Sequence, residues 1–262
     1  MSETAVIVIP ARMASTRYPN KPMAKINGIA MIERVWRIGK SVKGASDVII
    51  ATDDLDLKAF AEGFGAKVIM TSSLCLTGTD RVAEIAERSD IKHTIYFSLQ
   101  GDAVLTPPWV IEDVLQAMLK DQKIHIATPA VHLQGQALSD FVESKKGGSS
   151  SGTTVTFDKK GNAMYFSKAL IPYFRDENSA DRTVYRHIGL YAYRKDALQQ
   201  FGQLPEGLFE KSEKLEQLRA LENGIPIRVV RVDYRGRTHG SVDRPEDVSV
   251  VEAIIEKDGE LI

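Results

Sequence analysis

The feature that most constrains the fold is a short, unbroken apolar run near the start of the chain, Val6-Ile7-Val8-Ile9. A β-branched run of this length is typical of a strand buried on both faces, as in a parallel sheet. Similar runs recur at residues 48–50, 68–70 and 95–97, with helical patterns around 30–40, 54–64, 80–88 and 108–119. Strands that alternate with helices require right-handed crossovers. We therefore predict an α/β fold with a mostly parallel, doubly wound sheet.

The middle of the chain has a different pattern, which predicts a lobe beside this sheet. Residues 145–152 have the composition of a mobile loop. Two β-rich runs, 153–157 and 163–166, flank turn-forming residues and predict a hairpin. We expect one domain spanning residues 1–262, in which residues from about 130 to 190 form an inserted lobe.

The last part of the chain returns to the alternating pattern. An amphipathic helix is expected over residues 212–222, with Leu215, Leu218 and Leu221 on one side. A strand is expected at 227–232, and a final helix starts near Pro245.

Charge and cysteine content limit the partners and the compartment. The 262 residues contain 34 Lys and Arg against 35 Asp and Glu, a balance that argues against a general nucleic-acid or membrane-surface binder. The lone Cys75 allows no intramolecular disulfide and favours a reducing compartment. A small hydrophobe is a commoner role for such a cysteine than a catalytic thiol. Neither a signal peptide nor an apolar run of roughly 20 residues is evident, so we expect a cytoplasmic protein.

The loop that follows the first strand, residues 9–22, is the first segment with chemical character. Arg12, Arg17 and Lys21 fall within ten residues that contain no acidic side chain. Cations at the carboxyl edge of an open sheet suit a triphosphate, and arginine binds phosphate oxygens in a fork. A solvated basic loop is the alternative explanation. The segment matches neither the Rossmann nor the Walker glycine motif, which excludes both of those nucleotide sites.

Two aspartates at other predicted element ends are candidate metal ligands. Asp102 ends the segment 99–102 that directly follows the strand at 95–97, where a carboxylate can hold Mg²⁺ against nucleotide phosphates. An aspartate in a turn is also common for structural reasons. Asp243 precedes the final helix, and its neighbours Pro245, Glu246 and Asp247 are explained by helix initiation alone. Asp243 is not needed for that purpose and is free to face the crevice.

Other polar residues each have a structural explanation beside a functional one. Thr79 or Asp80 can cap the helix at 80–88, while the exposed amides and Arg81 can also contact a nucleotide. Taken singly, the remaining candidates are explained better by a solvated or interior structural role; these are Lys168, His187, Glu216 and Gln217.

Taken in order, these segments resemble the 3-deoxy-manno-octulosonate cytidylyltransferases, the CMP-KDO synthetases of lipopolysaccharide biosynthesis. The similarity begins in the basic loop and is nearly chain-long; its segments are 9–22, 51–54, 78–81, 100–102, 163–172, 186–193, 215–222 and 242–247. The resemblance implies a nucleotide-diphosphosugar transferase fold, CTP and an acidic sugar as substrates, Mg²⁺ as cofactor, and a homodimer formed through the acceptor-side lobe.

The resemblance also assigns roles to individual residues. The nucleotide would be bound by Ala11, Arg12, Ser15, Lys21, Thr79, Arg81 and Asp102. Asp102 and Asp243 would hold the metal, and with Arg12 and Lys21 they would form the catalytic set. The acceptor would be contacted by Gln100, Lys168, His187, Glu216 and Gln217.

The sequence departs from the family pattern on the acceptor side. Ala103 and Val104 replace Glu-Pro, Lys168 replaces an arginine, and the chain from Gly148 to Phe157 replaces an Asn-Pro-Asn stretch and the strand after it. Lysine keeps the charge but not the planar two-point grip of arginine. The acceptor is therefore expected to be 3-deoxy-manno-octulosonate, with a modified octulosonate, another ulosonic acid or a phosphonate as alternatives. A sugar-1-phosphate nucleotidyltransferase and a non-catalytic nucleotide-binding relative are the other hypotheses.

Overall fold

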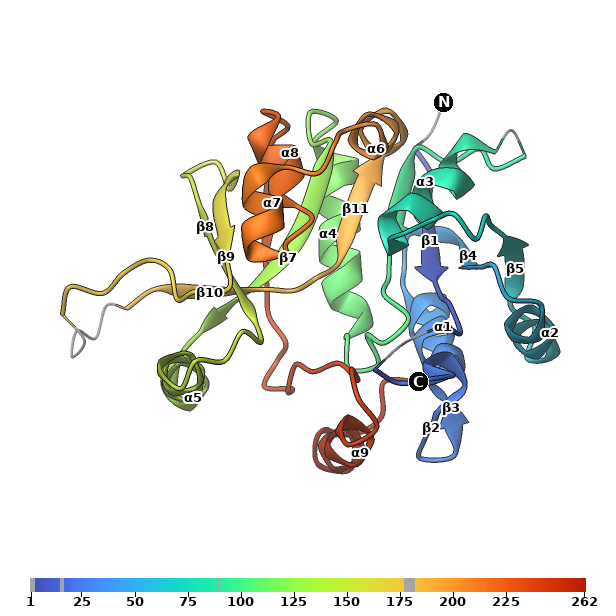
Figure 1. The fold of residues 1–262 in the computed structure, drawn as a ribbon, viewed down its shortest axis with the longest axis horizontal. Coiled ribbons are helices and arrows are strands. Elements are labelled where there is room, and N and C mark those ends of the chain that lie inside the picture. Colours follow the sequence, from blue (N-terminus) through green and yellow to red (C-terminus); the bar gives the residue numbers. More distant parts are fainter. Residues whose placement is uncertain (1–2, 15–16, 89, 177–181) are drawn as a thin grey trace.

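Ten strands form one continuous sheet in the computed structural model, which describes residues 3–14, 17–88, 90–176 and 182–262 (Figure 1). Their order across the sheet is β5-β4-β1-β6-β11-β7-β10-β8-β9, with β12 beside β7. The strands are β1 (Ala5–Pro10), β4 (Ala45–Thr52), β5 (Lys67–Met70), β6 (Ile95–Ser98), β7 (Ile126–Leu133), β8 (Thr153–Phe157), β9 (Ala163–Ser167), β10 (Val184–His187), β11 (Tyr191–Arg194) and β12 (Ile227–Val232). A small ribbon of β2 (Lys25–Ile26) and β3 (Ile29–Ala30) lies apart from it.

Most strands in the central part of the sheet run in one direction. Strands β5, β4, β1 and β6 are parallel neighbours. Strand β11 is antiparallel to both β6 and β7, so β7 and its parallel neighbour β12 share the direction of β6. The predicted α/β class with a mostly parallel sheet is confirmed.

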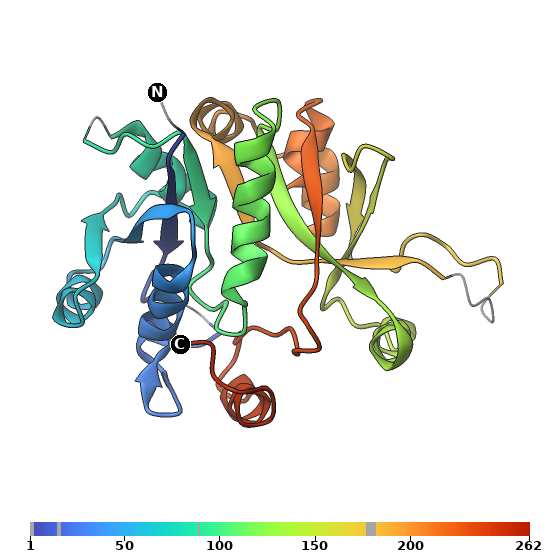
Figure 2. The ribbon, with the colours of Figure 1, turned by 180° about the vertical axis from the view of Figure 1, so that it is seen from behind.

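Helices cover both faces of the sheet, and alternate residues of β1 enter two different cores (Figure 1 and Figure 2). Ile7 and Ile9 pack into the core beneath α1 and α4, whereas Val6 and Val8 pack into the core beneath α3 and α6. The helices are α1 (Met31–Ser41), α2 (Leu55–Gly63), α3 (Gly78–Glu87), α4 (Pro108–Lys120), α5 (Gly135–Lys146), α6 (Lys195–Gly202), α7 (Leu208–Glu213), α8 (Leu218–Glu222) and α9 (Asp247–Asp258), with a short 3-10 helix, η1 (Lys21–Met23). None of the helices in the described part of the chain has the length and apolar character that a bilayer crossing requires.

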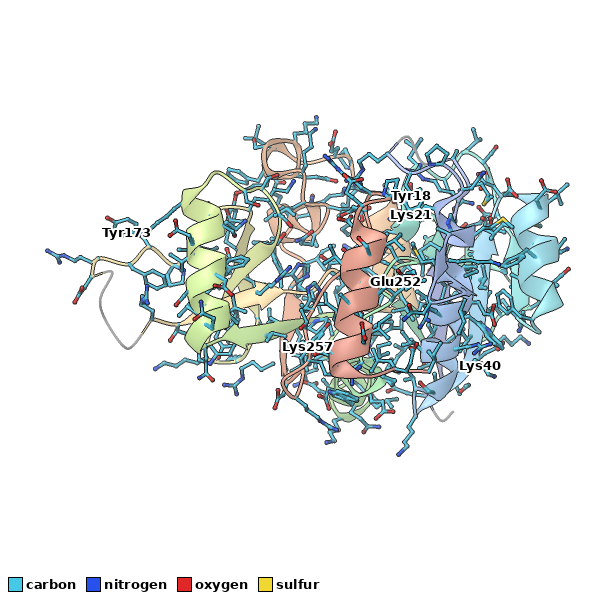
Figure 3. The ribbon with its side chains drawn as sticks, turned by 90° about the horizontal axis from the view of Figure 1, so that it is seen from below. Tyr18, Lys21, Lys40, Tyr173, Glu252 and Lys257 are labelled. Carbon is cyan, nitrogen blue, oxygen red and sulfur yellow. The ribbon has the colours of Figure 1, made fainter. Side chains whose placement is uncertain are left out.

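The predicted lobe is built on the same sheet. The hairpin of β8 and β9 forms as expected, and β10 joins it to β7. Helix α5 packs against this end of the sheet through a small core that contains Phe141 and Val184. In Figure 3, Tyr173 lies on a segment that projects from the body of the protein, and its side chain is 89% exposed.

The single helix predicted over residues 212–222 is wrong. The chain forms two short helices, α7 and α8, because Lys214 adopts a left-handed conformation with φ of 53° and ends α7. An ion pair between Arg219 and Glu210 spans the break at 2.6 Å. The leucine spacing that predicted one helix therefore comes from a turn that packs its leucines into the core.

The capping residue of α3 also differs from the prediction. Thr77, rather than Thr79 or Asp80, is the N-cap, and its hydroxyl accepts a hydrogen bond from the Asp80 amide. The Asp80 carboxylate in turn accepts from the Thr77 amide, so Asp80 completes a capping box. This arrangement leaves the Thr79 side chain available for contacts outside the helix.

The C-terminal segment is anchored by a buried arginine. The side chain of Arg34, on α1, is 2% exposed and donates to the carboxylate of Glu260 at 2.7 and 3.2 Å. Its Nε donates to the Ile26 carbonyl at 2.8 Å. The contact connects the chain after α9 to the helix that follows the basic loop.

We expect Glu260→Ala to destabilise the protein by about 1.5–3 kcal/mol, because it leaves a buried guanidinium without its charged acceptor. Urea unfolding measures the change. Glu256→Ala, at an exposed position of α9, is the matched control and should stay within about 0.5 kcal/mol of the wild type. Equal stability of the two variants would show that the Arg34 contact contributes nothing.

Candidate active site

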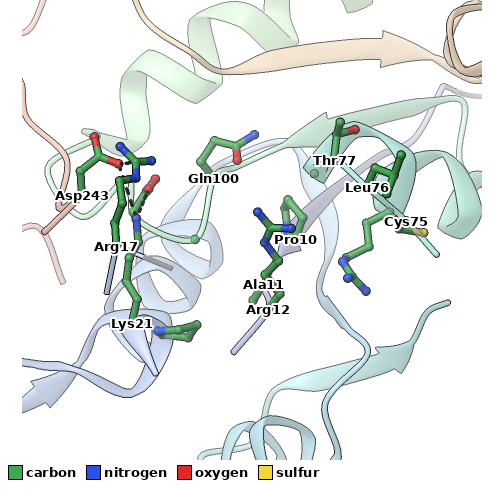
Figure 4. Close-up of a pocket in the computed structure, with 15 residues that line it drawn as sticks. Pro10, Ala11, Arg12, Arg17, Lys21, Cys75, Leu76, Thr77, Gln100 and Asp243 are labelled. Atoms are coloured by element: carbon green, nitrogen blue, oxygen red, sulfur yellow. Dashed lines mark hydrogen bonds and ion pairs between the residues drawn. The ribbon is translucent and has the colours of Figure 1, made fainter. Parts of the chain in front are cut away.

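A cavity opens at the carboxyl ends of the neighbouring strands β1 and β6 (Figure 4). Its walls come from the basic loop after β1, the chain before α3, the turn after β6, and the segment before α9. The lining residues are Pro10, Ala11, Arg12, Arg17, Lys21, Pro22, Cys75, Leu76, Thr77, Gly78, Arg81, Gln100, Gly101, Asp102 and Asp243. The carboxyl edge of the sheet is where open α/β folds bind their ligands.

Two glycines let these segments converge. A Cβ atom at Gly101 would lie 3.2 Å from the Pro10 carbonyl oxygen, and one at Gly78 would lie 3.2 Å from Pro10 Cγ. Contacts this close leave little room for a larger side chain. The turn after β6 and the start of α3 can therefore pack directly against the end of β1.

Opposite charges from three distant segments meet in this cavity. The Lys21 ammonium lies 2.6 Å from Asp102 Oδ2 and 3.9 Å from Asp243 Oδ1. Arg17 contacts the same Asp243 oxygen at 3.2 Å, as Figure 4 shows. In Figure 3, Lys21 lies near the N-terminal end of α9, which follows Asp243 in the chain, and Lys257 lies at the other end of the helix. The structure thus places Asp102 and Asp243, the two predicted metal ligands, around one lysine ammonium group.

The two carboxylates fit a magnesium ion. Both reach one ammonium nitrogen, so both are oriented toward a single centre of positive charge. Mg²⁺ prefers oxygen ligands and usually takes one or two carboxylates, with water and substrate phosphates completing its shell. Among the described residues, no cluster of three or more His, Cys, Asp or Glu side chains could hold a metal by itself. A pair of aspartates matches a metal that is shared with a phosphorylated ligand.

Three of the other predicted nucleotide residues line this cavity, whereas Thr79 does not, and its hydroxyl donates to Glu216 at 2.7 Å. Ala11 and Arg12 line the cavity, with Ala11 buried and Arg12 exposed. Arg81 also lines it, but its guanidinium is already engaged by Asp53 at 3.0 Å and Thr71 at 2.5 Å. Ser15 lies outside the described residues.

Cys75 lines the same cavity as a thiol. Its Sγ donates to Glu84 at 3.1 Å. Burial, together with the Glu84 carboxylate, raises the pKa of Cys75 to about 11. A thiol in this state is a poor nucleophile, which agrees with the non-catalytic role expected for this cysteine.

A second cavity, of about 780 Å³, adjoins the first one. Arg17 and Asp243 line both cavities. Four of the predicted acceptor residues line the second cavity; they are Lys168, His187, Glu216 and Gln217. The fifth, Gln100, lies in the first cavity. The fold thus brings the predicted nucleotide and acceptor residues into two neighbouring spaces with a shared wall.

His187 is a neutral hydrogen-bonding group in this second cavity. The Thr128 hydroxyl donates to the Leu190 carbonyl at 2.7 Å, so it accepts from His187 Nε2 at 2.8 Å. That assignment leaves His187 Nδ1 as an acceptor. Complete burial lowers the pKa of His187 to about 3, so its imidazole does not exchange protons near neutral pH.

Glu216 and Gln217 were expected either on the wet side of a helix or at an acceptor. The break at Lys214 places them in the cavity wall instead of on an exposed helical face. Glu216 Oε2 accepts from the Thr79 hydroxyl at 2.7 Å, while Glu216 Oε1 and Gln217 Nε2 are buried without a hydrogen-bond partner. The nearest cation to Glu216 Oε1 in an ion pair is Arg219 Nη2, at 4.0 Å. These two atoms offer one acceptor and one donor to a polar ligand.

A lysine organises the glycine- and serine-rich loop at the edge of the second cavity. The Lys145 ammonium donates to the carbonyls of Ser151, Gly152 and Lys168 at 2.8, 2.6 and 2.6 Å, and to that of Ser149 at 3.3 Å. Ser151, Gly152 and Lys168 line the cavity. The sequence correctly predicts a loop here, but it does not predict this cation at its centre.

Sequence reasoning missed several lining residues. The sequence predicts Arg17 as one of three loop cations suited to a triphosphate, but it does not predict the contact of Arg17 with Asp243. Tyr191, Arg186 and His239 also line the second cavity. Arg186 and Tyr191 fall within a segment that resembles the family, which was a usable signal, whereas His239 has none in the local sequence.

The fold and these cavities define an α/β protein with a charged ligand site at the carboxyl edge of its sheet. A family model described as Cytidylyltransferase matches residues 6–229. The 3-deoxy-manno-octulosonate cytidylyltransferase of Maricaulis maris is 48% identical over 99% of this chain and 100% of its own length. The 8-amino-3,8-dideoxy-manno-octulosonate cytidylyltransferase of Shewanella pealeana is 40% identical over 94% of this chain and 96% of its own length.

A solved structure of CMP:2-keto-3-deoxy-manno-octonic acid synthetase complexed with CTP is also similar, with a TM-score of 0.87 and 36% identity. The match covers 98% of this chain and 100% of that one. The chain belongs to the cytidylyltransferase family and is a nucleotidyltransferase, as the ordered motifs predict.

Protonation of buried histidine should make stability depend on pH. The pKa of His187 is about 3 in the folded protein and near 6.5 when exposed, so the stability that neutral His187 contributes is present above about pH 6.5 and is lost as the pH falls. Between about pH 6.5 and 5, we expect His187→Gln to lose stability less steeply than the wild type, by up to about 1.4 kcal/mol per pH unit. Urea unfolding at several pH values measures both slopes. Parallel slopes would show that folded His187 still takes up protons in this range.

Removal of the Lys145 ammonium should loosen the loop at 149–152. We expect Lys145→Met to lower the free energy of unfolding by about 1.5–3 kcal/mol, because the carbonyls lose a charged donor. Limited proteolysis should then cleave the loop faster. Lys160→Met, in an exposed turn, controls for the loss of a lysine. A loop that resists cleavage as well as in the control would contradict the role given to Lys145.

Proposed function

We propose that this protein transfers CMP from CTP to 3-deoxy-manno-octulosonate and releases pyrophosphate. The observation that carries the proposal is the pair of adjoining cavities with Arg17 and Asp243 in their shared wall. One cavity has the cations that a triphosphate requires, and the other has neutral polar groups and cations suited to a hydroxylated acid. The names of the relatives at 48% and 40% identity support an octulosonate as the acceptor.

In the proposed reaction, the anomeric hydroxyl of the sugar acid attacks the α-phosphorus of CTP. Pyrophosphate leaves from the opposite side, and the hydroxyl proton passes to water. Arg12 and Lys21 offset the charge of the departing phosphates. Glu216, Gln217 and His187 hold the sugar so that its hydroxyl faces the first cavity, which lowers the entropic part of the barrier.

Asp102 and Asp243 are the proposed magnesium ligands. The metal would supply charge neutralisation at the phosphates and would acidify the attacking hydroxyl. The support is the orientation of both carboxylates toward one cationic nitrogen. Lys21 keeps the pair together through its contacts with both side chains.

We also propose a homodimeric, cytoplasmic enzyme in lipopolysaccharide biosynthesis. The exposed Tyr173 on the projecting segment and Met164, which is 65% exposed, support an interface on the lobe. The requirement for CTP supports the cytoplasm. Sedimentation equilibrium tests the dimer, and a monomer at micromolar concentration would contradict it.

A pyrophosphate-release assay tests the reaction. Four nucleoside triphosphates are combined with 3-deoxy-manno-octulosonate, its 8-amino analogue, other ulosonic acids, phosphonates and sugar 1-phosphates. We expect the highest kcat/KM with CTP and 3-deoxy-manno-octulosonate. Preference for a sugar 1-phosphate would identify a different transferase, and CTP binding without turnover on any acceptor would identify a non-catalytic relative.

The metal assignment predicts a large loss of rate in two conservative variants. Asp102→Asn and Asp243→Asn should each lower kcat by at least about a hundredfold, because each loses an anionic metal ligand. Asp56→Asn, at an exposed site on α2, should retain the wild-type rate. Near-normal turnover in either cavity variant would remove that residue from the metal site.

A further inference from the structure

Buried polar atoms without partners are concentrated around the acceptor side of the molecule. Among the described residues, the buried atoms that lack a hydrogen-bond partner are Arg182 Nε, Arg186 Nε, Glu216 Oε1, Gln217 Nε2, Tyr234 OH and His239 Nδ1. Glu216 Oε1 has an ion-pair contact with Arg219 at 4.0 Å. All except Arg182 Nε belong to residues that line the second cavity or the space behind it. This space is a further cavity that shares Ser151, Arg186 and His239 with the second one. Because a buried polar atom without a partner is costly, such a concentration indicates a polar ligand.

Arg186 has the strongest need for a ligand in this group. It lies on β10, its guanidinium packs 5.7 Å from the centre of the Phe141 ring, and it lines both spaces. In the described part of the chain, no carboxylate forms an ion pair with it. Burial lowers the pKa of Arg186, which shows that its charge is poorly compensated by the protein.

The backbone is shaped to approach this side chain. Gly152 has a φ of +75°, and a Cβ there would lie 2.6 Å from the Phe141 ring and 3.6 Å from Arg186 Nε. Only glycine combines this conformation with this packing. The loop held by Lys145 therefore closes over the arginine instead of leaving it in open solvent.

The two neighbouring cations are less suited to a two-point contact. The Lys145 ammonium is surrounded by the loop carbonyls. Lys168 lines the cavity, but a lysine presents a compact point charge without a planar fork. Of the three cations Arg186, Lys145 and Lys168, Arg186 is thus the one that matches a carboxylate in both charge and geometry.

We propose that Arg186 binds the carboxylate of the sugar acid and makes that group a requirement for the acceptor. The assignment rests on the proposed function, since it assumes an acidic acceptor. The two-point contact with the acid is thereby assigned to Arg186 on β10. It is not assigned to position 168, where this chain has a lysine and the family has an arginine. Lys168 adds positive charge, while Glu216, Gln217 and His187 contact hydroxyl groups.

The test pairs a change in the protein with a change in the ligand. KM is measured for 3-deoxy-manno-octulosonate and for its carboxamide with the wild type, Arg186→Gln and Arg186→Lys. Loss of a charged hydrogen-bonded contact should raise KM for the acid about tenfold to a hundredfold in Arg186→Gln, with KM for CTP unchanged. The wild type should lose a similar factor on the carboxamide, and Arg186→Gln should lose no more than about twofold.

Two further variants separate this role from a general effect of charge. Arg237→Gln removes a cation that lines only the space behind the second cavity and should leave KM for the acid unchanged. Arg186→Lys keeps the charge without the fork, so its KM should lie between those of the wild type and Arg186→Gln. Thermal unfolding with and without CTP verifies that each variant is folded and binds the nucleotide.

Several outcomes would overturn the assignment. Wild-type KM for the acid in Arg186→Gln would do so, as would equal losses on the acid and the carboxamide in that variant. If Arg186→Gln does not fold, a wild type that accepts acid and carboxamide equally would still exclude a carboxylate contact. Absence of wild-type turnover on any octulosonate would instead refute the proposed function, and this assignment with it.

Discussion

The ammonium group of Lys21 connects three segments that are far apart in the chain. Its contacts with Asp102 and Asp243 bring the loop after β1, the turn after β6 and the chain before α9 to one point. Two carboxylates gathered around one point would repel each other without a cation between them, since nearby like charges interact strongly when partly buried. Lys21 therefore helps to hold the first cavity in shape. A metal ion bound to a phosphorylated ligand can contact the same two carboxylates in place of the lysine ammonium.

The strands were predictable where burial on both faces dictates composition, and the helix break was not. The runs at β1, β4 and β6 are apolar because each strand lies between two helical layers, so local sequence is sufficient evidence. The leucines around Lys214 satisfy helical spacing even though the chain turns there. That turn is stabilised by Arg219 and Glu210, which are nine positions apart and interact only after folding.

The site was predictable to a similar extent. Cations gathered in one short loop fit either a phosphate site or a solvated basic loop by composition alone, whereas the order of the motifs identifies the family. The significance of Arg186 cannot be found in the same way, because a missing counter-charge is a property of three-dimensional surroundings. Its neighbours in sequence, Tyr185 and His187, do not reveal that Phe141 and Gly152 enclose it.

The acceptor side divides its work between groups that suit hydroxyls and a cation that suits an acid. The neutral His187 imidazole, Gln217 Nε2 and the carboxyl oxygen Oε1 of Glu216 can exchange hydrogen bonds with hydroxyls, whereas Arg186 lacks only an anion. A site built in this way rejects ligands that leave its buried polar atoms unpaired, and that penalty discriminates far better than a difference in apolar contact. Selection for an acid then requires no close fit around the whole sugar. A cavity of about 780 Å³ can accordingly tolerate changes at the far end of the acceptor while still demanding its carboxylate.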